Sequence, residues 1–481
     1  MSIRDAWQRT FGFSGLPPVV VEPVDEPISS DAGLIPLRYL DERLGLTAGF
    51  AAQLGETRHA VSLRHTLAEM VRSRTFGILA GYEDQNDHDA LRGDSIFKLV
   101  AGRLPTDDDL ASQPTLSRFE NAVAAGSLLK LEAWFTERFV GSWPRVPSRL
   151  TLDVDVFDDP THGGQQLTFF HGYYDQYQYL ARVITCAEND QVVLPVLLHG
   201  TAHPTLGADD DLRRVVAALR RQNPDVQVHV RADSGYATPR FYEVCEELGI
   251  DYTIGLGMNA VLKARSDALL EQAVAQYDQT GQPQRLFTAF WYQAKTWDAE
   301  RWVVVKCEAQ AQGTNRRAVV TNRPGARVLP QAAYDEYARR GESENRNKEL
   351  KCGLRADRLS DHRYLANCFR LFLHTLAHNL LVHARRLLPE PALPRPSGEL
   401  PVETLGGRAR RQHFNRRRQA DPLGEGHPDT WRTMLIKVAA RIMVRSRRVR
   451  ILLSGSWPFL EFYRQVSDAI LAVPKPRLDS S

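Results

Sequence analysis

Cysteine is scarce in this chain of 481 residues, which contains only Cys186, Cys245, Cys307, Cys352 and Cys368. Their number is odd, they are scattered, and none stands in a Cys-x-x-Cys pair. This pattern argues against a disulfide framework and a zinc ribbon. It favours a reducing compartment, and we therefore expect a cytoplasmic protein.

Long apolar runs are also missing. None approaches the roughly 20 consecutive residues that a membrane-spanning helix requires, so we expect no membrane partner. Residues 1–20 lack the sustained apolar core of a signal peptide. The chain has neither a Gly-x-Ser-x-Gly motif nor a phosphate-binding loop, which leaves the hydrolase classes built on those motifs without support.

The net charge is only +3, and 43% apolar with 25% charged residues is ordinary for a globular protein. A chain of this length can form two or three domains. Its positive charge is unevenly spread, because residues 401–457 contain thirteen Lys and Arg against four Asp and Glu. This segment, which includes Arg416, Arg417 and Arg418, is a candidate contact for a polyphosphate.

The spacing of apolar residues indicates the organisation of the chain. Residues 37–140 have helical periodicity after an irregular lead-in, and strands alternate with helices from about 150 to 256, which indicates an α/β core. Three antiparallel strands are expected at 286–292, 301–307 and 317–321. The predicted regions are a helical N-terminal region (1–145), a first core part (146–258), a β-rich insertion (259–330), a second core part (331–390) and a basic C-terminal region (391–481).

Two segments near the ends of the chain suggest contacts with nucleic acid. Pro114–Glu120 predicts a short helix, with Thr115 as its cap, that is similar to the reading helix of a helix-turn-helix motif. Arg441–Leu453 alternates basic and apolar residues, which fits either a strand with one charged face or a helix with a broad basic side. We therefore predict that the N-terminal region binds DNA.

A polar helix predicted near residue 340 has an ordered face. At 100° per residue, Tyr337, Arg340, Glu344 and Lys351 fall on one narrow side, and Lys348 lies on the same side. Glu342 and Glu349 fall away from it. The alternative interpretation is a solvated stripe held together by Arg340–Glu344 and Glu344–Lys348 pairs.

Aspartates stand near the ends of two predicted strands. Asp153 and Asp155 share one face because strand side chains alternate, and Asp155 is nearer the carboxyl end. Asp233 ends a second strand, where open α/β sheets place their ligands, although such an aspartate can also be a helix cap or turn former. Asp158 and Asp159 are interpreted as turn residues after a bend.

Carboxylates from two strands and one helix can form a site for two divalent metal ions, which cleaves or joins phosphodiester bonds. Histidines surround the first motif, but carboxylates suit Mg²⁺, whereas histidine more often indicates zinc or iron. We expect structural or DNA-facing roles for these histidines, which are His162, His171, His199 and His203.

The spacing Tyr337-x2-Arg340-x3-Glu344-x6-Lys351 resembles the Tyr-Arg-Glu-Lys signature of bacterial insertion-sequence transposases of the DDE type. The closest resemblance is to insertion-sequence family 1380, which is related to family 4. The blocks that carry the likeness span about residues 59–453. They are Gly81–His88, Leu110–Glu120, Leu152–Gly163, His171–Gln176 and Arg231–Gly235.

The resemblance implies an RNase H-like catalytic core in which Asp155, Asp233 and Glu344 are the catalytic triad. The three acids would hold two Mg²⁺ ions, with Mn²⁺ as a substitute. The 111-residue gap between the second and third acid agrees with a β-rich insertion at 286–321. Related chains often carry Asp-x-Thr in the first motif, whereas this chain has Asp155-Val-Phe157, which leaves the choice between Asp153 and Asp155 open.

The resemblance also implies contacts with DNA. Arg340, Lys348 and Lys351 would hold the phosphate backbone, and Tyr337 would donate to a phosphate or stack on a base. The family forms a hairpin on the transposon end and holds a flipped base with aromatic residues. Trp291 and Trp297 are the candidates here, and their alternative role is that of a packed core anchor.

We therefore expect a cut-and-paste DNA transposase in the bacterial cytoplasm, associated with the nucleoid. Its partners would be the terminal inverted repeats of the transposon, the target DNA and, in the DNA complex, a second copy of the chain. The alternatives are a domesticated, catalytically silent DNA-binding protein and a simple metal-dependent nuclease.

Overall fold

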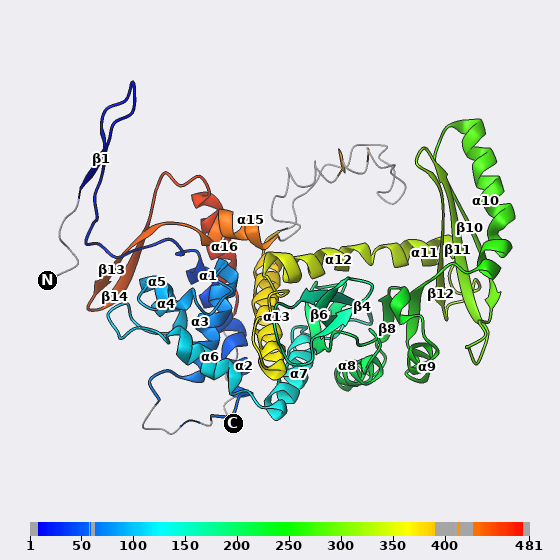
Figure 1. Cartoon of the computed structure of the whole chain (residues 1–481), viewed down its shortest axis with the longest axis horizontal. Coiled ribbons are helices and arrows are strands. Elements are labelled where there is room, and N and C mark those ends of the chain that lie inside the picture. The colour runs from blue at the N-terminus through cyan, green and yellow to red at the C-terminus, as the bar shows by residue number, and fades with distance from the viewer. Residues whose placement is uncertain are drawn as a thin grey trace.

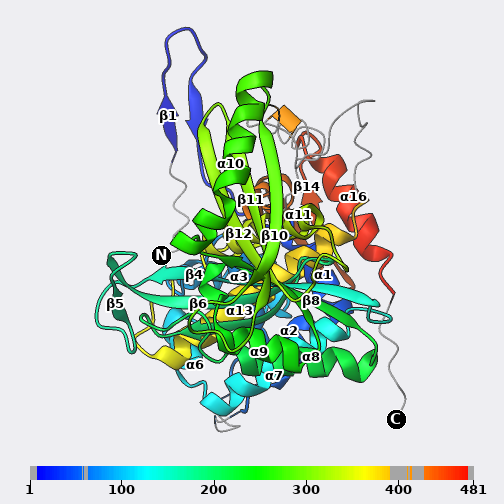
Figure 2. The same ribbon diagram turned by 90° about the vertical axis from the view of Figure 1, so that its right-hand side faces the viewer.

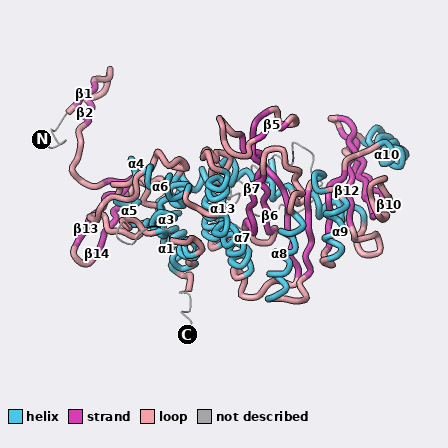
Figure 3. Tube along the Cα trace, turned by 60° about the horizontal axis from the view of Figure 1, so that its bottom comes forward, coloured by secondary structure: helices cyan, strands magenta, loops and turns pink. Residues whose placement is uncertain are grey.

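The computed structural model describes residues 8–56, 58, 63–389, 409, 412–413 and 427–474. A helical body lies at one end of the elongated molecule, a mixed sheet follows it, and the strands of the insertion form the far end (Figure 1). Figure 3 shows α13 (Tyr364–Arg386) between the helical body and the strands of the mixed sheet. No helix in the described part of the chain is long and apolar enough to cross a membrane.

The helical body is built around α13, whose side chains are almost all buried. Phe369 of this helix lies 5.7 Å from Phe50 and 5.4 Å from Phe119 between ring centroids, so a late helix completes the core of an early region. The other face of α13 meets the sheet, where Asn379 Nδ2 donates to the Val192 carbonyl at 2.9 Å. The remaining helices of this body are α1 (Leu34–Leu44), α2 (Leu46–Ala52), α3 (Leu67–Ala80), α4 (His88–Leu91), α5 (Ser95–Ala101), α6 (Gln113–Asn121) and α7 (Ala125–Val140).

Capping chemistry sets the ends of these helices. Thr66 and Glu69 form a reciprocal capping box that begins α3, and Gly81 ends the helix at φ 89°, which favours glycine. The helix predicted at Pro114–Glu120 is present as α6. Thr115 is not its cap, because Ser112 is the N-cap and Thr115 lies inside the first turn.

One sheet of nine strands among the described residues runs in the order β10-β11-β12-β9-β8-β4-β6-β5, and β7 also pairs with β6. β4 is parallel to β8, β8 is parallel to β9, and the other pairings are antiparallel. The strands of its first half are β4 (Arg149–Pro160), β5 (Phe169–His171), β6 (Gln176–Cys186), β7 (Val192–Leu198), β8 (Gln227–Ala232) and β9 (Asp251–Leu256). The strands of the insertion are β10 (Gln284–Tyr292), β11 (Arg301–Gln310) and β12 (Gly313–Thr321).

The two faces of the central strands pack against different elements. Leu152 and Val154 of β4 join one core with α8 (Ala208–Gln222) and α9 (Pro239–Glu247). Residues of β6 and β7, including Val183, join the core around α13 on the opposite face. Because strand side chains alternate, Asp153 and Asp155 point away from the α8 side.

The three antiparallel strands predicted between 286 and 321 are confirmed as β10–β12, which also continue the main sheet through the pairing of β12 with β9. The sequence did not indicate α10 (Ala260–Thr280), a long helix that packs on β10 and β11 (Figure 2). Val303 and Val305 face α10, whereas Val304 faces α11 (Pro330–Ala338). The insertion is therefore covered on both faces.

The two ends of the chain meet in a second, three-stranded sheet. β3 (Ile28–Ser29) pairs with β13 (Ala440–Arg445), which forms a hairpin with β14 (Arg448–Leu453). The strand interpretation of Arg441–Leu453 is therefore right. The lead-in predicted as irregular contains an antiparallel hairpin, because β1 (Arg9–Phe11) pairs with β2 (Val19–Val21). The last helices are α15 (Pro428–Trp431) and α16 (Leu460–Leu471).

Candidate active site

Two neighbouring strands bring the first two acids together. Asp153 of β4 stands opposite Arg231 of β8, and Val154 stands opposite Ala232. Continuing this parallel register by one residue sets Asp155 beside Asp233, where β8 ends and β4 runs on past it. Asp233 then begins a short 3₁₀ turn, where its carboxylate accepts from the Gly235 amide at 2.9 Å.

Asp153 and Asp155 have different surroundings although they share a face. Asp153 is buried, and both of its oxygens accept from the Arg231 guanidinium at 2.7 Å. A bidentate pair of this kind satisfies the charge of both partners. Asp155 lies nearer the strand end and is partly open, which makes it the better candidate of the two for binding a ligand.

The carboxylate of Asp155 is held by three donors. Its Oδ2 accepts from Arg340 Nη1 at 2.9 Å and from Asn347 Nδ2 at 3.2 Å, and its Oδ1 accepts from the Val156 amide at 2.9 Å. Burial raises the pKa of Asp155 to about 6 against the lowering effect of Arg340, and the charges of Asp233 and Glu344 add to the rise. The three acids of the predicted triad therefore share one electrostatic environment.

Arg340 connects the helix acid to the strand acid. Its Nη2 lies 2.9 Å from Glu344 Oε1 while Nη1 holds Asp155. Glu344 itself is about half exposed, on α12 (Gly341–Lys348). The buried Nε of Arg340 has no hydrogen-bond partner within the described residues. The Arg340–Glu344 contact is thus part of this site as well as an i,i+4 helix pair.

The hydroxyl of Tyr337 packs so closely against the backbone of Gly255 that only glycine fits at that position. A Cβ atom added to Gly255 of β9 would stand 2.6 Å from the Tyr337 hydroxyl and 3.0 Å from the Ser234 amide nitrogen. The ring of Tyr337 also lies 5.9 Å from the Arg340 guanidinium, which orients both side chains. Burial raises the pKa of Tyr337, so its hydroxyl stays a hydrogen-bond donor.

The helix that carries the Tyr-Arg-Glu-Lys residues is not continuous. α11 ends at Ala338, α12 begins at Gly341, and a single π-helical turn, η3 (Glu349–Gly353), follows. Such a turn holds more residues than an α-turn and rotates what comes after it. Lys351 lies within this turn and pairs with Asp158, at 2.5 Å from Nζ to Oδ1, while Lys348 is exposed.

Asp158 and Asp159 are not turn residues, which corrects our interpretation. β4 continues to Pro160 because β6, which the sequence did not indicate, pairs along its whole outer half. Asp158 accepts from Lys351 and from Gln176 Nε2 at 3.0 Å. Asp159 is fully buried, and burial raises its pKa well above the ordinary value.

The two candidate tryptophans differ in exposure. Trp297 is buried, with its ring 5.3 Å from that of Tyr242 and 5.5 Å from that of Tyr292, which fits the core-anchor alternative. Trp291 on β10 is about half exposed and packs edge-on against Trp302. The basic triplet Arg416, Arg417 and Arg418 lies outside the described residues.

Among the described residues, no group of three or more His, Cys, Asp or Glu side chains is placed to hold a metal ion. The Arg340 guanidinium stands between Asp155 and Glu344 instead. The chemistry of the donor set still fits Mg²⁺, because all three acids offer carboxylate oxygens, which this hard cation prefers. Burial is the main cause of the raised pKa of Asp155, and the positive charge of Arg340 opposes it.

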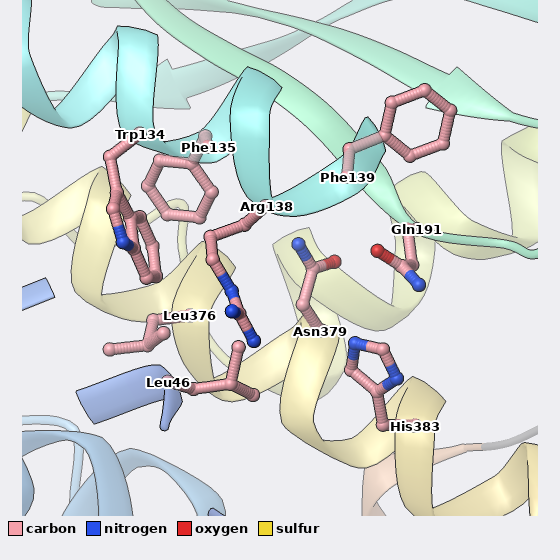
Figure 4. Close-up of a pocket in the computed structure, with 9 residues that line it drawn as sticks. All are labelled: Leu46, Trp134, Phe135, Arg138, Phe139, Gln191, Leu376, Asn379 and His383. Carbon is pink, nitrogen blue, oxygen red and sulfur yellow. The ribbon is translucent and has the colours of Figure 1, made fainter. Parts of the chain in front are cut away.

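Our reading of the sequence missed Arg231, Asn347 and Gly255 as parts of the site. Asn347 stands seven residues after Arg340 and three after Glu344, a spacing that places all three on one face of a helix. A pocket between α7 and α13 is separate from the acids (Figure 4). It is lined by Leu46, Trp134, Phe135, Arg138, Phe139, Gln191, Leu376, Asn379 and His383.

One family model matches the chain in a comparison with known proteins. The family model described as "Transposase DDE domain group 1" matches residues 15–395. No curated protein matches the chain. Among solved structures, the chain is similar to the piggyBac transposase in a synaptic complex with hairpin DNA, with 9% identity, a TM-score of 0.37, and coverage of 94% of this chain and 87% of that chain.

Proposed function

Because the chain belongs to the transposase DDE domain family, we propose that it cuts and joins DNA strands with Asp155, Asp233 and Glu344 as its catalytic acids. The observation that carries this proposal is the β4–β8 register, which brings Asp155 beside Asp233, together with the Arg340 bridge that ties Glu344 to Asp155. The proposal takes Asp155 rather than Asp153 because the Arg231 guanidinium donates to both oxygens of Asp153, which is buried.

The proposed core is RNase H-like. The order β7-β6-β4-β8-β9, in which β6 alone runs opposite to the others, supports this assignment. In that arrangement the first and fourth strands, β4 and β8, are adjacent and parallel, and acids at the point where their pairing ends share one site. The strands β10–β12 between the second and third acid support the long insertion that separates Asp233 from Glu344.

Asp155, Asp233 and Glu344 would hold Mg²⁺, with two ions per site and Mn²⁺ as a substitute. Such ions, when bound, activate the attacking water or 3′-hydroxyl and stabilise the departing oxygen. Asn347 and the Val156 amide would keep the Asp155 carboxylate oriented. Tyr337, locked against Gly255, would hold the start of α12 at the ends of the strands.

Arg340 would have two roles in turn. Before DNA and cations arrive, its guanidinium neutralises Asp155 and Glu344. Once the carboxylates bind cations, the same planar group is free to hold a DNA phosphate through two parallel hydrogen bonds.

Further DNA contacts remain proposals. Lys348 is exposed on the same helix, and Lys351 would leave Asp158 to reach the backbone. Trp291 is the accessible tryptophan of the insertion, whereas burial removes Trp297 from the proposed contacts. We propose the inverted repeats of an insertion sequence of family 1380 as the substrate, a hairpin on the transposon end as intermediate, and a homodimer as the active complex.

The test is end cleavage. The protein, Mg²⁺ and a duplex carrying the terminal inverted repeats of its own element are incubated, and nicked, hairpin and strand-transfer products are separated on denaturing gels. Wild type and the exposed-acid control Glu271→Gln are expected to give all products, and Glu344→Gln none. Cleavage that survives Glu344→Gln would overturn the assignment of the acid.

The two alternatives make different predictions in the same assay. A silent DNA-binding protein would bind the repeats without any product. A simple nuclease would cut DNA without preference for the repeats and would give no strand transfer. The family membership and the insertion before Glu344 favour the transposase over both.

A further inference from the structure

The segment from β5 to the start of β6 exposes a group of aromatic rings. We call residues 169–177 the aromatic hairpin. Its exposed rings are Phe169, Phe170, Tyr173, Tyr174 and Tyr177, with side chains between 38% (Tyr174) and 86% (Tyr173) accessible. A single exposed aromatic residue needs no explanation, but a contiguous group of this size marks an interaction surface.

The aromatic hairpin is an ordered structure. The amides of Tyr174 and Asp175 both donate to the His171 carbonyl, at 3.1 and 2.9 Å, and Asp175 has a φ of 52°. The ring of Phe170 lies 5.7 Å from that of Tyr177, and the rings of Tyr173 and Tyr174 are 5.0 Å apart. The rings are therefore held in place before any partner binds, which lowers the cost of ordering them.

The aromatic hairpin adjoins the proposed active site. β6 runs antiparallel to β4, so the hairpin lies beyond the carboxyl end of the strand that carries Asp155. Gln176 at its base donates to Asp158, which also holds Lys351. Figure 2 shows β5 projecting from the body of the molecule beside β4 and β6.

Electrostatics supports the same placement. Burial raises the pKa of Tyr174, and the charges of Asp158, Asp233 and Asp155 add to the rise. The hydroxyl of Tyr174 is thus within the field of the carboxylates, while its neighbour Tyr173 points to solvent.

We infer that the aromatic hairpin is a stacking platform for unpaired bases of the DNA strand whose phosphate lies at Asp155 and Asp233. The inference rests on the proposed function. Aromatic faces stack on any base, but a base pair inside a duplex hides its faces, so an unpaired end is the substrate that fits. The hairpin contains no Lys or Arg, which argues against a role as a phosphate clamp.

The experiment uses the full chain carrying Glu344→Gln and no added metal, so that binding is measured without cleavage. The probes are two fluorescent duplexes that differ only in a three-base unpaired overhang, titrated in an anisotropy assay. Tyr173→Ala with Tyr174→Leu removes two rings, and Tyr173→Phe with Tyr174→Phe keeps the stacking faces. Phe13→Ala, an exposed aromatic residue beyond β1 on a separate hairpin, is the matched control.

Loss of the two rings is expected to weaken binding to the overhang duplex about tenfold, and binding to the blunt duplex less than about twofold. The Phe pair and Phe13→Ala should bind both probes like the parent. Equal loss on both probes, or no loss on either, would overturn the inference. So would unchanged DNA binding with a shift in sedimentation, which would assign the surface to self-association.

The outcome is separable from the test of the proposed function. If Glu344→Gln retains cleavage, the catalytic assignment fails, whereas a selective loss of overhang binding would still support the aromatic hairpin. If Glu344→Gln abolishes cleavage and the ring variants bind the overhang normally, the catalytic assignment holds and the aromatic hairpin is excluded.

Discussion

Arg340 Nη1 lies 2.9 Å from Asp155 Oδ2, and the same guanidinium reaches Glu344, 2.9 Å from Oε1. One side chain thus neutralises a strand acid and a helix acid that are far apart in the sequence. The proposed chemistry requires cations at the same oxygens, so the guanidinium and the metal ions compete for them.

Removing the guanidinium should strengthen metal binding. A charge-assisted hydrogen bond contributes about 1.5–3 kcal/mol, so Arg340→Ala should lower the Kd for Mn²⁺ about tenfold or more in the absence of DNA. Titration calorimetry or the spectrum of free Mn²⁺ measures the change. Arg339→Ala, at the exposed neighbouring position, serves as the control, and an unchanged Kd in Arg340→Ala would contradict the competition.

Substitution of Asp153 should mainly lower stability, whereas substitution of Asp155 should mainly lower activity. Asp153→Asn leaves the Arg231 charge buried without its partner, which costs about 3–5 kcal/mol of unfolding free energy. Asp155→Asn should abolish cleavage and change stability much less, because its carboxylate is already penalised by burial. Urea unfolding and end cleavage together check this, and the opposite assignment of effects would exchange the roles of the two acids.

Gly255 should be needed for the position of Tyr337. A methyl group in Gly255→Ala would stand 2.6 Å from the Tyr337 hydroxyl, and an overpacked core costs about 1–3 kcal/mol. Gly257→Ala, where the added Cβ meets nothing within 4 Å, is the matched control. Adding Tyr337→Phe to Gly255→Ala removes the clashing oxygen and should restore part of the stability, measured by thermal unfolding. If the two glycine variants behave alike, the close approach is not a constraint.

The stability of the helical body should fall in acid because of His374 on α13. Burial lowers the pKa of this histidine from 6.5 to about 3, and its Nδ1 lies 2.8 Å from the Leu354 carbonyl. The unfolded chain binds this proton more readily than the folded one, so the contribution is complete above about pH 6.5 and is lost as pH falls towards 3.

His374 alone should contribute a loss of about 1.4 kcal/mol for each pH unit below 6.5, as seen in urea unfolding at pH 7 and pH 5. Burial also lowers the pKa of His88 and His383, so His374→Gln should reduce the slope by this amount without abolishing it, whereas the same change at the exposed His362 should leave it intact. Equal slopes in wild type and His374→Gln would show that another group carries the acid sensitivity.

Much of the site followed from local pattern. Alternation put Asp153 and Asp155 on one face, and the end of β8 put Asp233 where α/β sheets hold their ligands, whereas the family resemblance joined Asp155 and Asp233 in one triad. The register of β4 and β8 sets these two residues side by side. The choice of Glu344 over Glu349 followed from helical geometry. Glu349 is in fact buried, within 2.9 Å of Arg346.

The remainder depended on contacts between distant segments. The Arg340–Asp155 pair joins residues 185 positions apart, and nothing local to either residue indicates it. Lys351 reaches Asp158 from a π-helical turn, and Asp158 lies on the part of β4 that pairs with β6. The sequence did not indicate β6, because both faces of this strand are buried and its residues therefore do not alternate between apolar and polar. The sequence analysis assigned α13 to the second part of the α/β core, but this helix also completes the core of the helical body through Phe369.

The central claim is that three carboxylates on β4, β8 and α12 carry out one reaction. Its most direct test is single-turnover cleavage of a duplex ending in the element's inverted repeats, with Mg²⁺, by Asp155→Asn, Asp233→Asn and Glu344→Gln beside Glu271→Gln. We predict that each of the first three lowers the rate by at least about a thousandfold, as loss of a metal ligand should, while repeat binding and the Glu271→Gln rate stay unchanged. Cleavage near the wild-type rate by any one of the three would contradict the account.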